Sequence, residues 1–330
     1  MKDKKFFIPD GIEYYMPKEA ISFETLRHKI LKIFKKYKYN YVIPPIFDNL
    51  ENLLTLKGND LQNETIKINN YSNDGTIGVR VDITPQLSRI DYQSFLEHKP
   101  NRYCYMGDIL RINAEGFDRK NPYQVGAEYF GQLTKKVDVE IIKLLVDIIT
   151  LSKSKKILIE LGDLSFINLF LQNLNINSKT RSILLDFINL KSNHEIKECF
   201  DRYKINKKHL PYLLEIINLS GDNNVLKDLM KLTKMCNINF EVQLNQLKAI
   251  GNSLCSYKKP CTINYDLTEL HGFDYQGSVI YTVYVPNLRK EIARGGRYKA
   301  YQLSENKHRE ATGFSLDLRD LLTVLIKNSS

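Results

Sequence analysis

The chain has 330 residues, of which 43% are hydrophobic and 26% charged, and its formal net charge is +10 at pH 7. This composition excludes a collagen-like, low-complexity or wholly disordered protein, and the length, which favours about two domains, is enough to bury a core without disulfides or metal ions. The positive charge would attract phosphates, but its 35 lysines and 13 arginines are spread along the chain, so we expect no nucleic-acid surface.

The first half of the chain alternates helical and strand patterns. Hydrophobic residues at steps of three and four predict a helix over residues 22–37, and a β-branched, aromatic run over 39–47 predicts a strand. Four further strands are expected at residues 67–70, 76–81, 102–112 and 122–131. Residues 137–150 then predict a second amphipathic helix, and residues 157–161 a short apolar strand.

Helical spacing dominates residues 163–255, which we interpret as a helical insertion. Ser192 and Glu195 have the spacing of a capping box just ahead of an apolar run. Strands return afterwards, with a central strand over 279–285 and a second over 289–293. Gly295-Gly296 predicts a tight turn, and residues 313–326 a closing strand and helix.

The strands at the two ends of the sequence must pair with each other, because neither set closes a core alone. We therefore expect one α+β domain with a mixed, mostly antiparallel sheet, formed by residues 1–162 and 256–330. Residues 163–255 would interrupt it as the helical insertion.

No segment predicts export or membrane insertion. The stretch that comes closest to a membrane helix, residues 141–149, is interrupted by Lys143 and Asp147. The N-terminus lacks the apolar core of a secretory signal. The five cysteines form no C-x-x-C pair, which is typical of buried thiols in a reducing compartment. The histidines have no metal-ligand spacing, so we expect a cytoplasmic protein without a metal site.

Five polar side chains fall on or beside neighbouring predicted strands: Asp82, Thr84, Arg111, Gln124 and Glu128. Residues 124 and 128 are an even number apart, so on a regular strand their side chains face the same side. A carboxylate binds an ammonium group, and an arginine or amide binds a carboxylate, so this set suits a zwitterionic amino acid. From the residues alone, exposed cross-strand ion pairs remain the alternative.

The segment Arg102-Tyr-Cys-Tyr-Met-Gly-Asp-Ile-Leu-Arg111 resembles motif 2 of the class II aminoacyl-tRNA synthetases, in their histidine branch. Residues 23–45 resemble motif 1, which builds the synthetase dimer. The two histidine-specific motifs and motif 3 have counterparts in Leu270-His-Gly-Phe-Asp-Tyr275, Ala293-Arg-Gly-Gly-Arg-Tyr298 and Ala311-Thr-Gly-Phe-Ser-Leu-Asp-Leu318. The resemblance covers nearly the whole chain and implies a class II synthetase-like catalytic-core fold that carries a helical insertion.

Three positions depart from the synthetase motifs. Asn113 replaces a glutamate that helps to hold ATP, His271 a catalytic arginine, and Asp320 an arginine that grips the ATP phosphates. Adenylate formation depends on fixed cations around a negatively charged transition state, so we expect ATP activation to be lost. We expect no catalytic residue in this chain, and no anticodon-binding domain after motif 3.

The amino-acid half of the synthetase site is better preserved. The resemblance implies a histidine pocket formed by Asp82, Thr84, Arg111, Gln124, Glu128, Tyr275 and Tyr298. Gln276 replaces the second tyrosine of the first histidine motif.

A synthetase body with this pocket and without the ATP clamp resembles the ATP phosphoribosyltransferase regulatory subunits. Residues 42–45, 79–86 and 312–318 look more like that family than like active synthetases. The resemblance implies a short-form catalytic subunit as partner, which joins ATP to phosphoribosyl pyrophosphate with Mg²⁺ in the first step of histidine biosynthesis. It further implies a hetero-octamer, a self-dimer through the motif 1 region, and L-histidine as effector, with no cofactor bound by this chain.

Two other functions stay open at this stage. A divergent or truncated histidyl-tRNA synthetase would still make histidyl-adenylate. A synthetase-like RNA-binding protein is favoured only by the charge.

Overall fold

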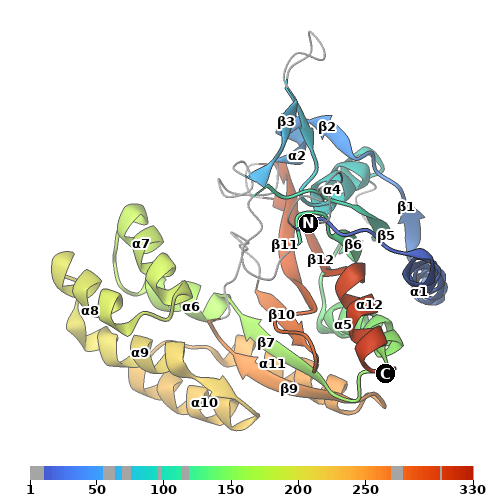
Figure 1. Cartoon of the computed structure of the whole chain (residues 1–330). Helices are drawn as coiled ribbons and strands as arrows, with labels where there is room; N and C mark the ends of the chain where they lie inside the picture. Colours follow the sequence, from blue (N-terminus) through green and yellow to red (C-terminus); the bar gives the residue numbers. More distant parts are fainter. Residues whose placement is uncertain are drawn as a thin grey trace, which may run out of the picture.

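The computed structural model describes residues 11–54, 64–68, 76–95, 99–112, 119–268, 278–304 and 307–329. A nine-stranded sheet dominates this part of the chain (Figure 1). Its strands, in spatial order, are β1 (Asn40–Val42), β5 (Asn101–Asp108), β6 (Tyr123–Phe130), β12 (Lys307–Asp317), β11 (Ala293–Ser304), β10 (Val279–Tyr284), β7 (Ile157–Asp163), β9 (Cys261–Asp266) and β8 (Ser220–Gly221). A second, three-stranded sheet consists of β2 (Phe47–Asn49), β4 (Ile77–Val79) and β3 (Lys67–Ile68).

The large sheet is mostly antiparallel. Among its described pairs only β1 with β5 and β7 with β9 run parallel. β6, from the first half of the chain, pairs with β12 from its end, which confirms that the terminal strands share one sheet. The predicted α+β class with a mixed, mostly antiparallel sheet is therefore correct.

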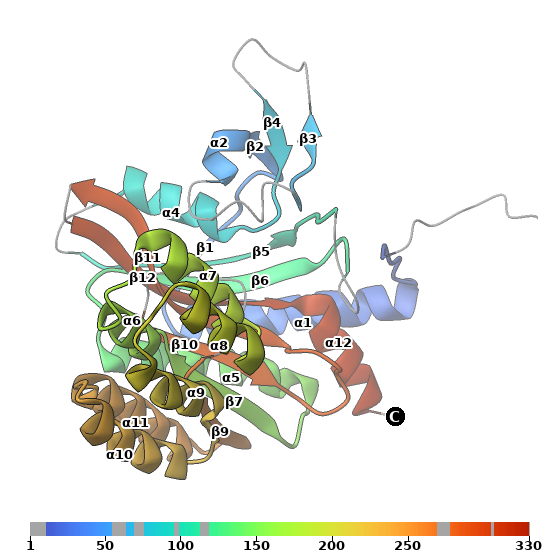
Figure 2. The same ribbon diagram turned by 90° about the vertical axis from the view of Figure 1, so that its left-hand side faces the viewer.

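Helices cover both faces of this sheet. α1 (Pro17–Lys36), α5 (Lys135–Ile149) and α12 (Leu318–Lys327) pack together on one face, and α4 (Thr84–Gln93) lies on the other (Figure 2). α1 starts at a proline and buries one stripe of side chains, Phe23, Leu26, Ile30 and Phe34. This stripe has the three-to-four spacing from which the helix is predicted.

A buried carboxylate fixes α4 to the sheet. Asp91 is fully buried and accepts hydrogen bonds from Arg309 Nε (3.0 Å), Tyr301 Oη (2.5 Å) and Asn101 Nδ2 (2.6 Å). These donors come from β12, β11 and β5, and a buried charge needs such partners to be tolerated. The other end of α4, which begins at Thr84, is thereby held over the sheet.

Six helices lie between β7 and β9 and extend to one side of the sheet (Figure 1). They are α6 (Ser165–Gln172), α7 (Ser178–Asn189), α8 (Asn193–Arg202), α9 (Leu210–Asn218), α10 (Asn224–Cys236) and α11 (Glu241–Cys255). The last of them, α11, packs on α5, β7 and β9 of the main sheet. The division of the chain at residues 163 and 255 stays a prediction.

Three local expectations are wrong. Gly295-Gly296 forms no turn but lies inside β11, where a Cβ on Gly296 would come 2.8 Å from the carbonyl oxygen of Val279. β11 begins only at Ala293, so residues 289–293 do not form the predicted strand, and residues 39–47 divide between β1 and β2 of separate sheets. In both sheets, pairing between distant strands decides these boundaries.

The predicted capping box at Ser192 is also absent, because its side chain makes no capping hydrogen bond with α8. By contrast, Asn177 ahead of α7 does cap its helix, because its side chain accepts a hydrogen bond from Thr180 N.

Candidate functional site

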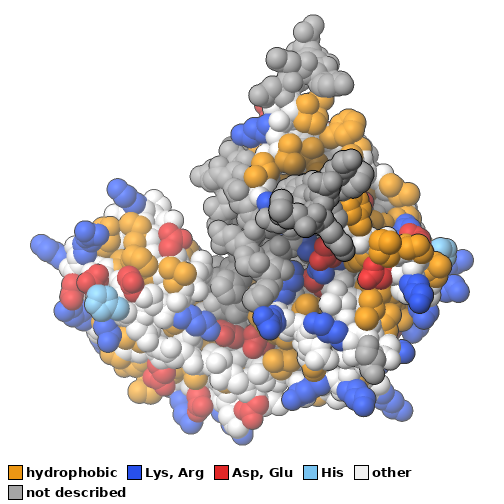
Figure 3. Space-filling view, in the orientation of Figure 1, with side chains coloured by type: hydrophobic (Ala, Val, Ile, Leu, Met, Phe, Trp, Pro, Cys, Tyr) orange, Lys and Arg blue, Asp and Glu red, His pale blue; other side chains and the backbone are white. Residues whose placement is uncertain are grey.

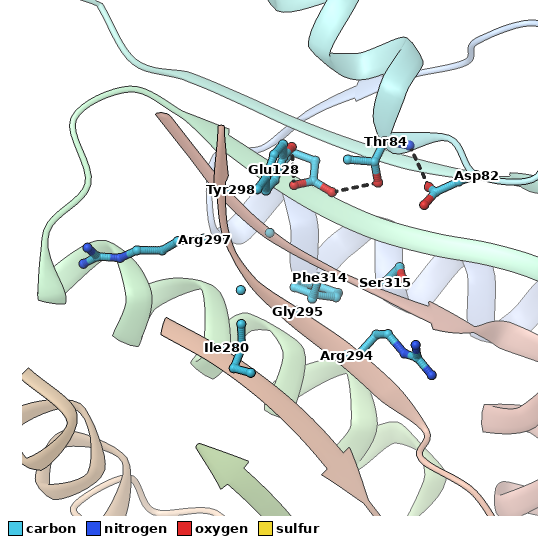
Figure 4. Close-up of a pocket in the computed structure, with 12 residues that line it drawn as sticks. Asp82, Thr84, Glu128, Ile280, Arg294, Gly295, Arg297, Tyr298, Phe314 and Ser315 are labelled. Carbon is cyan, nitrogen blue, oxygen red and sulfur yellow. Dashed lines mark hydrogen bonds between the residues drawn. The ribbon is translucent and has the colours of Figure 1, made fainter. Parts of the chain in front are cut away.

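A pocket lies on the α4 side of the sheet, where β6, β12, β11 and β10 run side by side (Figure 4). The register places Glu128, Gly313, Gly296 and Ile280 in one row across these four strands. The two glycines form a floor without side chains. A Cβ on Gly313 would overlap Glu128 Oε2, so the glutamate can lie over this strand only because residue 313 is a glycine.

Two buried carboxylates line the pocket, one on each side of Thr84 (Figure 4). Glu128 accepts hydrogen bonds from Thr84 Oγ1 (3.2 Å) and Tyr298 Oη (2.9 Å), and its exposed fraction is 2%. Asp82 Oδ1 accepts from Thr84 N (2.9 Å) and Gln124 Nε2 (3.0 Å). These donors orient both acids, and two carboxylates in the lining suit a cationic ligand group.

The arginines of β11 divide between the pocket and the opposite side. Arg297 forms two hydrogen bonds to Asp138 of α5, at 2.9 and 2.6 Å, and Figure 4 shows it turned away from the acids. Arg294 also lines the pocket and forms an ion pair with Glu291. The lining therefore contains two acids and one arginine whose side chain belongs to this face of β11.

The structure brings most of the predicted pocket residues together. Asp82, Thr84, Glu128 and Tyr298 line the pocket, and Gln124 lies behind Asp82. Arg111 is half-buried and is not among the described residues of the lining. Tyr275 lies outside the described residues.

Sequence reasoning missed Arg294 as a pocket residue. Its signal was its even spacing from Gly296 and Tyr298, which places all three side-chain positions on one face of a strand. That signal was hidden because the Gly295-Gly296 pair was interpreted as a turn.

The region that resembles the ATP clamp is occupied by internal ion pairs. Asp320 is buried and binds Arg119, and its other oxygen lies 3.0 Å from Lys290 Nζ. Arg119 also contacts Asp317 (3.4 Å) and Glu13 (2.9 Å). Asp320 stands where the resemblance expects an arginine that grips the ATP phosphates, and it lies in a cluster where three carboxylates surround Arg119. Asn113 and His271 lie outside the described residues.

Among the described residues, no three His, Cys, Asp or Glu side chains are grouped so that they could hold a metal ion. Likewise, no helix among those described is both long and apolar enough to cross a membrane.

Comparison with known proteins defines the class of this fold. Residues 11–321 match the family model of histidyl-tRNA synthetase. The fold is similar to an ATP phosphoribosyltransferase regulatory subunit/histidyl-tRNA synthetase from Bacillus halodurans C, with a TM-score of 0.82 and 19% identity over 97% of this chain and 83% of that one. It is also similar to histidyl-tRNA synthetase from Nostoc sp. PCC 7120, with a TM-score of 0.77 and 19% identity over 98% and 76% of the two chains. The fold is thus the class II synthetase fold of the histidine branch.

The curated relatives are more specific. The ATP phosphoribosyltransferase regulatory subunit of Methylococcus capsulatus is 30% identical over 98% of this chain and 80% of its own length. That of Thioalkalivibrio sulfidiphilus is 32% identical over 97% and 81% of the two chains. The chain belongs to the ATP phosphoribosyltransferase regulatory subunits, a family of non-catalytic subunits.

The cluster of carboxylates around Arg119 predicts how the stability of the fold depends on pH. Burial, together with the charge of Asp320, raises the pKa of Asp317 from 3.8 to about 6. The folded protein therefore binds a proton on the Asp317 carboxyl more tightly than the unfolded chain does. The stability that this protonated carboxyl contributes at low pH is lost as the pH rises through about 6. Asp317→Asn keeps the oxygen that accepts from Arg319 N and Tyr123 N but cannot ionise. Relative to the wild type, this variant should gain up to about 3 kcal/mol in unfolding free energy between pH 4 and pH 7.

Urea unfolding of both proteins across this pH range measures the difference. Parallel pH profiles of the two proteins would contradict the assignment.

Proposed function

We propose that this chain is the regulatory subunit that a short-form ATP phosphoribosyltransferase requires for the first step of histidine biosynthesis. Family membership supports this, and so does the fold of a chain in the ATP phosphoribosyl transferase complex from Thermotoga maritima, which has a TM-score of 0.66 and 16% identity. In this proposal the catalytic partner supplies the Mg²⁺ and substrate sites, and four subunits of each kind form a hetero-octamer. This chain has no cofactor of its own, works in the cytoplasm and binds neither a membrane nor nucleic acid.

We propose further that the pocket binds L-histidine as the feedback effector. The observation that carries this is the pair of buried carboxylates, Asp82 and Glu128, which line one pocket together with Arg294 and a glycine floor. Histidine has an ammonium group, an imidazole and a carboxylate, so it needs partners of both charges in its site. A coupling of about 1–3 kcal/mol between this pocket and the partner's active site would change affinity about 5–150-fold, which is enough for feedback control.

The charge of the pocket should determine histidine sensitivity. Glu128→Gln keeps the hydrogen-bonding shape but removes the charge that would pair with the ligand, so inhibition by histidine should weaken about 10–100-fold. The purified chain is mixed with a short-form catalytic subunit, and complex formation and phosphoribosyl-ATP production are measured with increasing histidine.

The matched control is Glu310→Gln, an exposed glutamate on β12, which should keep wild-type sensitivity. Failure of the wild-type chain to bind or activate the catalytic subunit would reject the regulatory function. Unchanged inhibition in Glu128→Gln would reject only the pocket as the effector site.

The second candidate is a divergent histidyl-tRNA synthetase, which the fold of its solved neighbours favours. The cluster around Arg119 opposes this candidate. Adenylate formation needs cations that are available to the phosphates, whereas three carboxylates of the chain surround the guanidinium of Arg119. We expect the isolated chain to show no histidine-dependent pyrophosphate–ATP exchange above background, with an active histidyl-tRNA synthetase assayed in parallel. Exchange at a comparable rate would favour the synthetase.

We also propose a self-dimer through α1 and β1, the motif 1 region. Ile21 on α1 is 70% exposed, and Ile43, directly after the edge strand β1, is 78% exposed. Figure 3 shows hydrophobic side chains on the side of the molecule that carries these elements. A two-fold axis would bury the same patch on both copies.

Ile21→Glu should convert the dimer to a monomer, because it places a charge in the buried patch of each copy. Sedimentation equilibrium measures the mass. Val242→Glu, a substitution at a residue of α11 with 72% exposure, is the matched control and should leave the dimer intact. A dimer of unchanged stability in Ile21→Glu would place the interface elsewhere.

A further inference from the structure

A short segment between β4 and α4, residues 80–82, carries Asp82 to the pocket. It belongs to neither a strand nor a helix, so the regular hydrogen bonds of those elements do not fix it. Figure 4 shows Asp82 on this segment, beside Thr84 at the start of α4. Arg80, the first residue of the segment, is buried, and so is Asp82. The position of this acid therefore depends on the contacts that hold residues 80–82.

The guanidinium of Arg80 joins this segment to two other parts of the chain. Its Nε donates to the carbonyl oxygen of Asp108 at the end of β5 (2.8 Å). Its Nη1 donates to the carbonyl oxygens of Pro44 (2.8 Å) and Pro45 (3.1 Å). A guanidinium carries five N–H donors in a fixed planar arrangement, so it can bond acceptors from separate segments at once, which the single ammonium group of a lysine cannot do.

The backbone of Arg80 is held by the same two parts of the chain. Its N–H donates to the carbonyl oxygen of Ile46 (3.0 Å), and its own carbonyl oxygen accepts from Leu110 N (3.1 Å). Main chain and side chain of Arg80 thus bind residues 44–46 on one side and residues 108–110 on the other. The segment that carries Asp82 consequently starts from a fixed point.

A second set of contacts links the guanidinium to the acid through β5 and β6. A Cβ on Gly107 would come 2.3 Å from Arg80 Nη2, so the guanidinium lies where a residue without a side chain leaves room for it. Gly107 is paired in register with Gln124. The side-chain amide of Gln124 donates to Asp82 Oδ1 (3.0 Å) and accepts from Ile83 N (2.9 Å). Arg80 therefore fixes the chain ahead of Asp82, and Gln124 fixes the carboxylate and the residue after it.

We propose that Arg80 is a positioning residue of the pocket. By holding residues 80–82 between β5 and residues 44–46, it keeps the Asp82 carboxylate where a cationic group of the ligand binds. Arg80 is not among the described residues that line the pocket, so its effect on a ligand acts through Asp82. This inference rests on the proposed function of the pocket as a histidine site.

The test is a double-mutant cycle on the binding of L-histidine, measured by calorimetry on the full chain. Arg80→Lys should lower the affinity about 10-fold, because a lysine keeps the charge but cannot bond all three carbonyl oxygens. Asp82→Asn should lower it about 10–100-fold. In the Asp82→Asn background, Arg80→Lys should change the affinity by less than about twofold, because both residues act through one carboxylate.

Gly107→Ala is a second way to displace the guanidinium, since the added Cβ would overlap Arg80 Nη2. It should lower histidine affinity as Arg80→Lys does, and only when Asp82 is present. The matched control is Arg89→Lys, at an arginine of α4 whose side chain is 46% exposed and pairs with Asp48. This control should keep the wild-type affinity. Thermal unfolding of each variant shows whether the fold is retained.

Wild-type histidine affinity in folded Arg80→Lys would overturn the inference, and if that variant does not fold, wild-type affinity in Gly107→Ala would do so. Losses that multiply in the double variants would also overturn it, because they would show that Arg80 acts without Asp82. Absence of histidine binding to the wild type would instead reject the histidine pocket itself, and with it this inference.

Discussion

The antiparallel pairing of β6 with β12 is the interaction on which the rest of the structure depends. It joins strands separated by nearly two hundred residues and places Glu128 directly opposite Gly313. A side chain at residue 313 would overlap the glutamate, so the pairing and the position of the acid require each other. The next strand in the sheet, β11, then brings Tyr298 and Arg294 to the same face, and the pocket exists only where these strands meet.

The distribution of charge explains how a synthetase fold can serve regulation. In the pocket, Thr84, Gln124 and Tyr298 donate hydrogen bonds to Asp82 and Glu128, whose carboxylates line the cavity. In the cluster around Arg119, by contrast, carboxylates of the chain itself surround the cation. A site of the first kind can bind an effector, whereas a site of the second kind stabilises the attachment of α12 and has little charge left for phosphates.

Much of the architecture and part of the site could be predicted from the sequence. Helical spacing predicted α1 and α5, and the need to close one core predicted that the terminal strands share a sheet. Motif resemblance predicted the family and placed Thr84, Glu128 and Tyr298 in one pocket. The failure at Gly295-Gly296 has a physical cause: glycines serve both tight turns and close backbone contacts, and only the neighbouring strands decide between the two.

The sequence by itself determined the family, the class of fold and the residues that could form an amino-acid pocket, because these depend on motifs and on local hydrophobic patterns. Only the tertiary structure decided which charges the pocket contains. Arg294 and Arg297 are three residues apart and chemically identical, yet alternation along a continuous strand directs one to the pocket and the other to Asp138. Asp320 likewise acts as a partner of Arg119 because the folded chain brings α12 beside that arginine, a contact between residues about two hundred positions apart that no local pattern specifies.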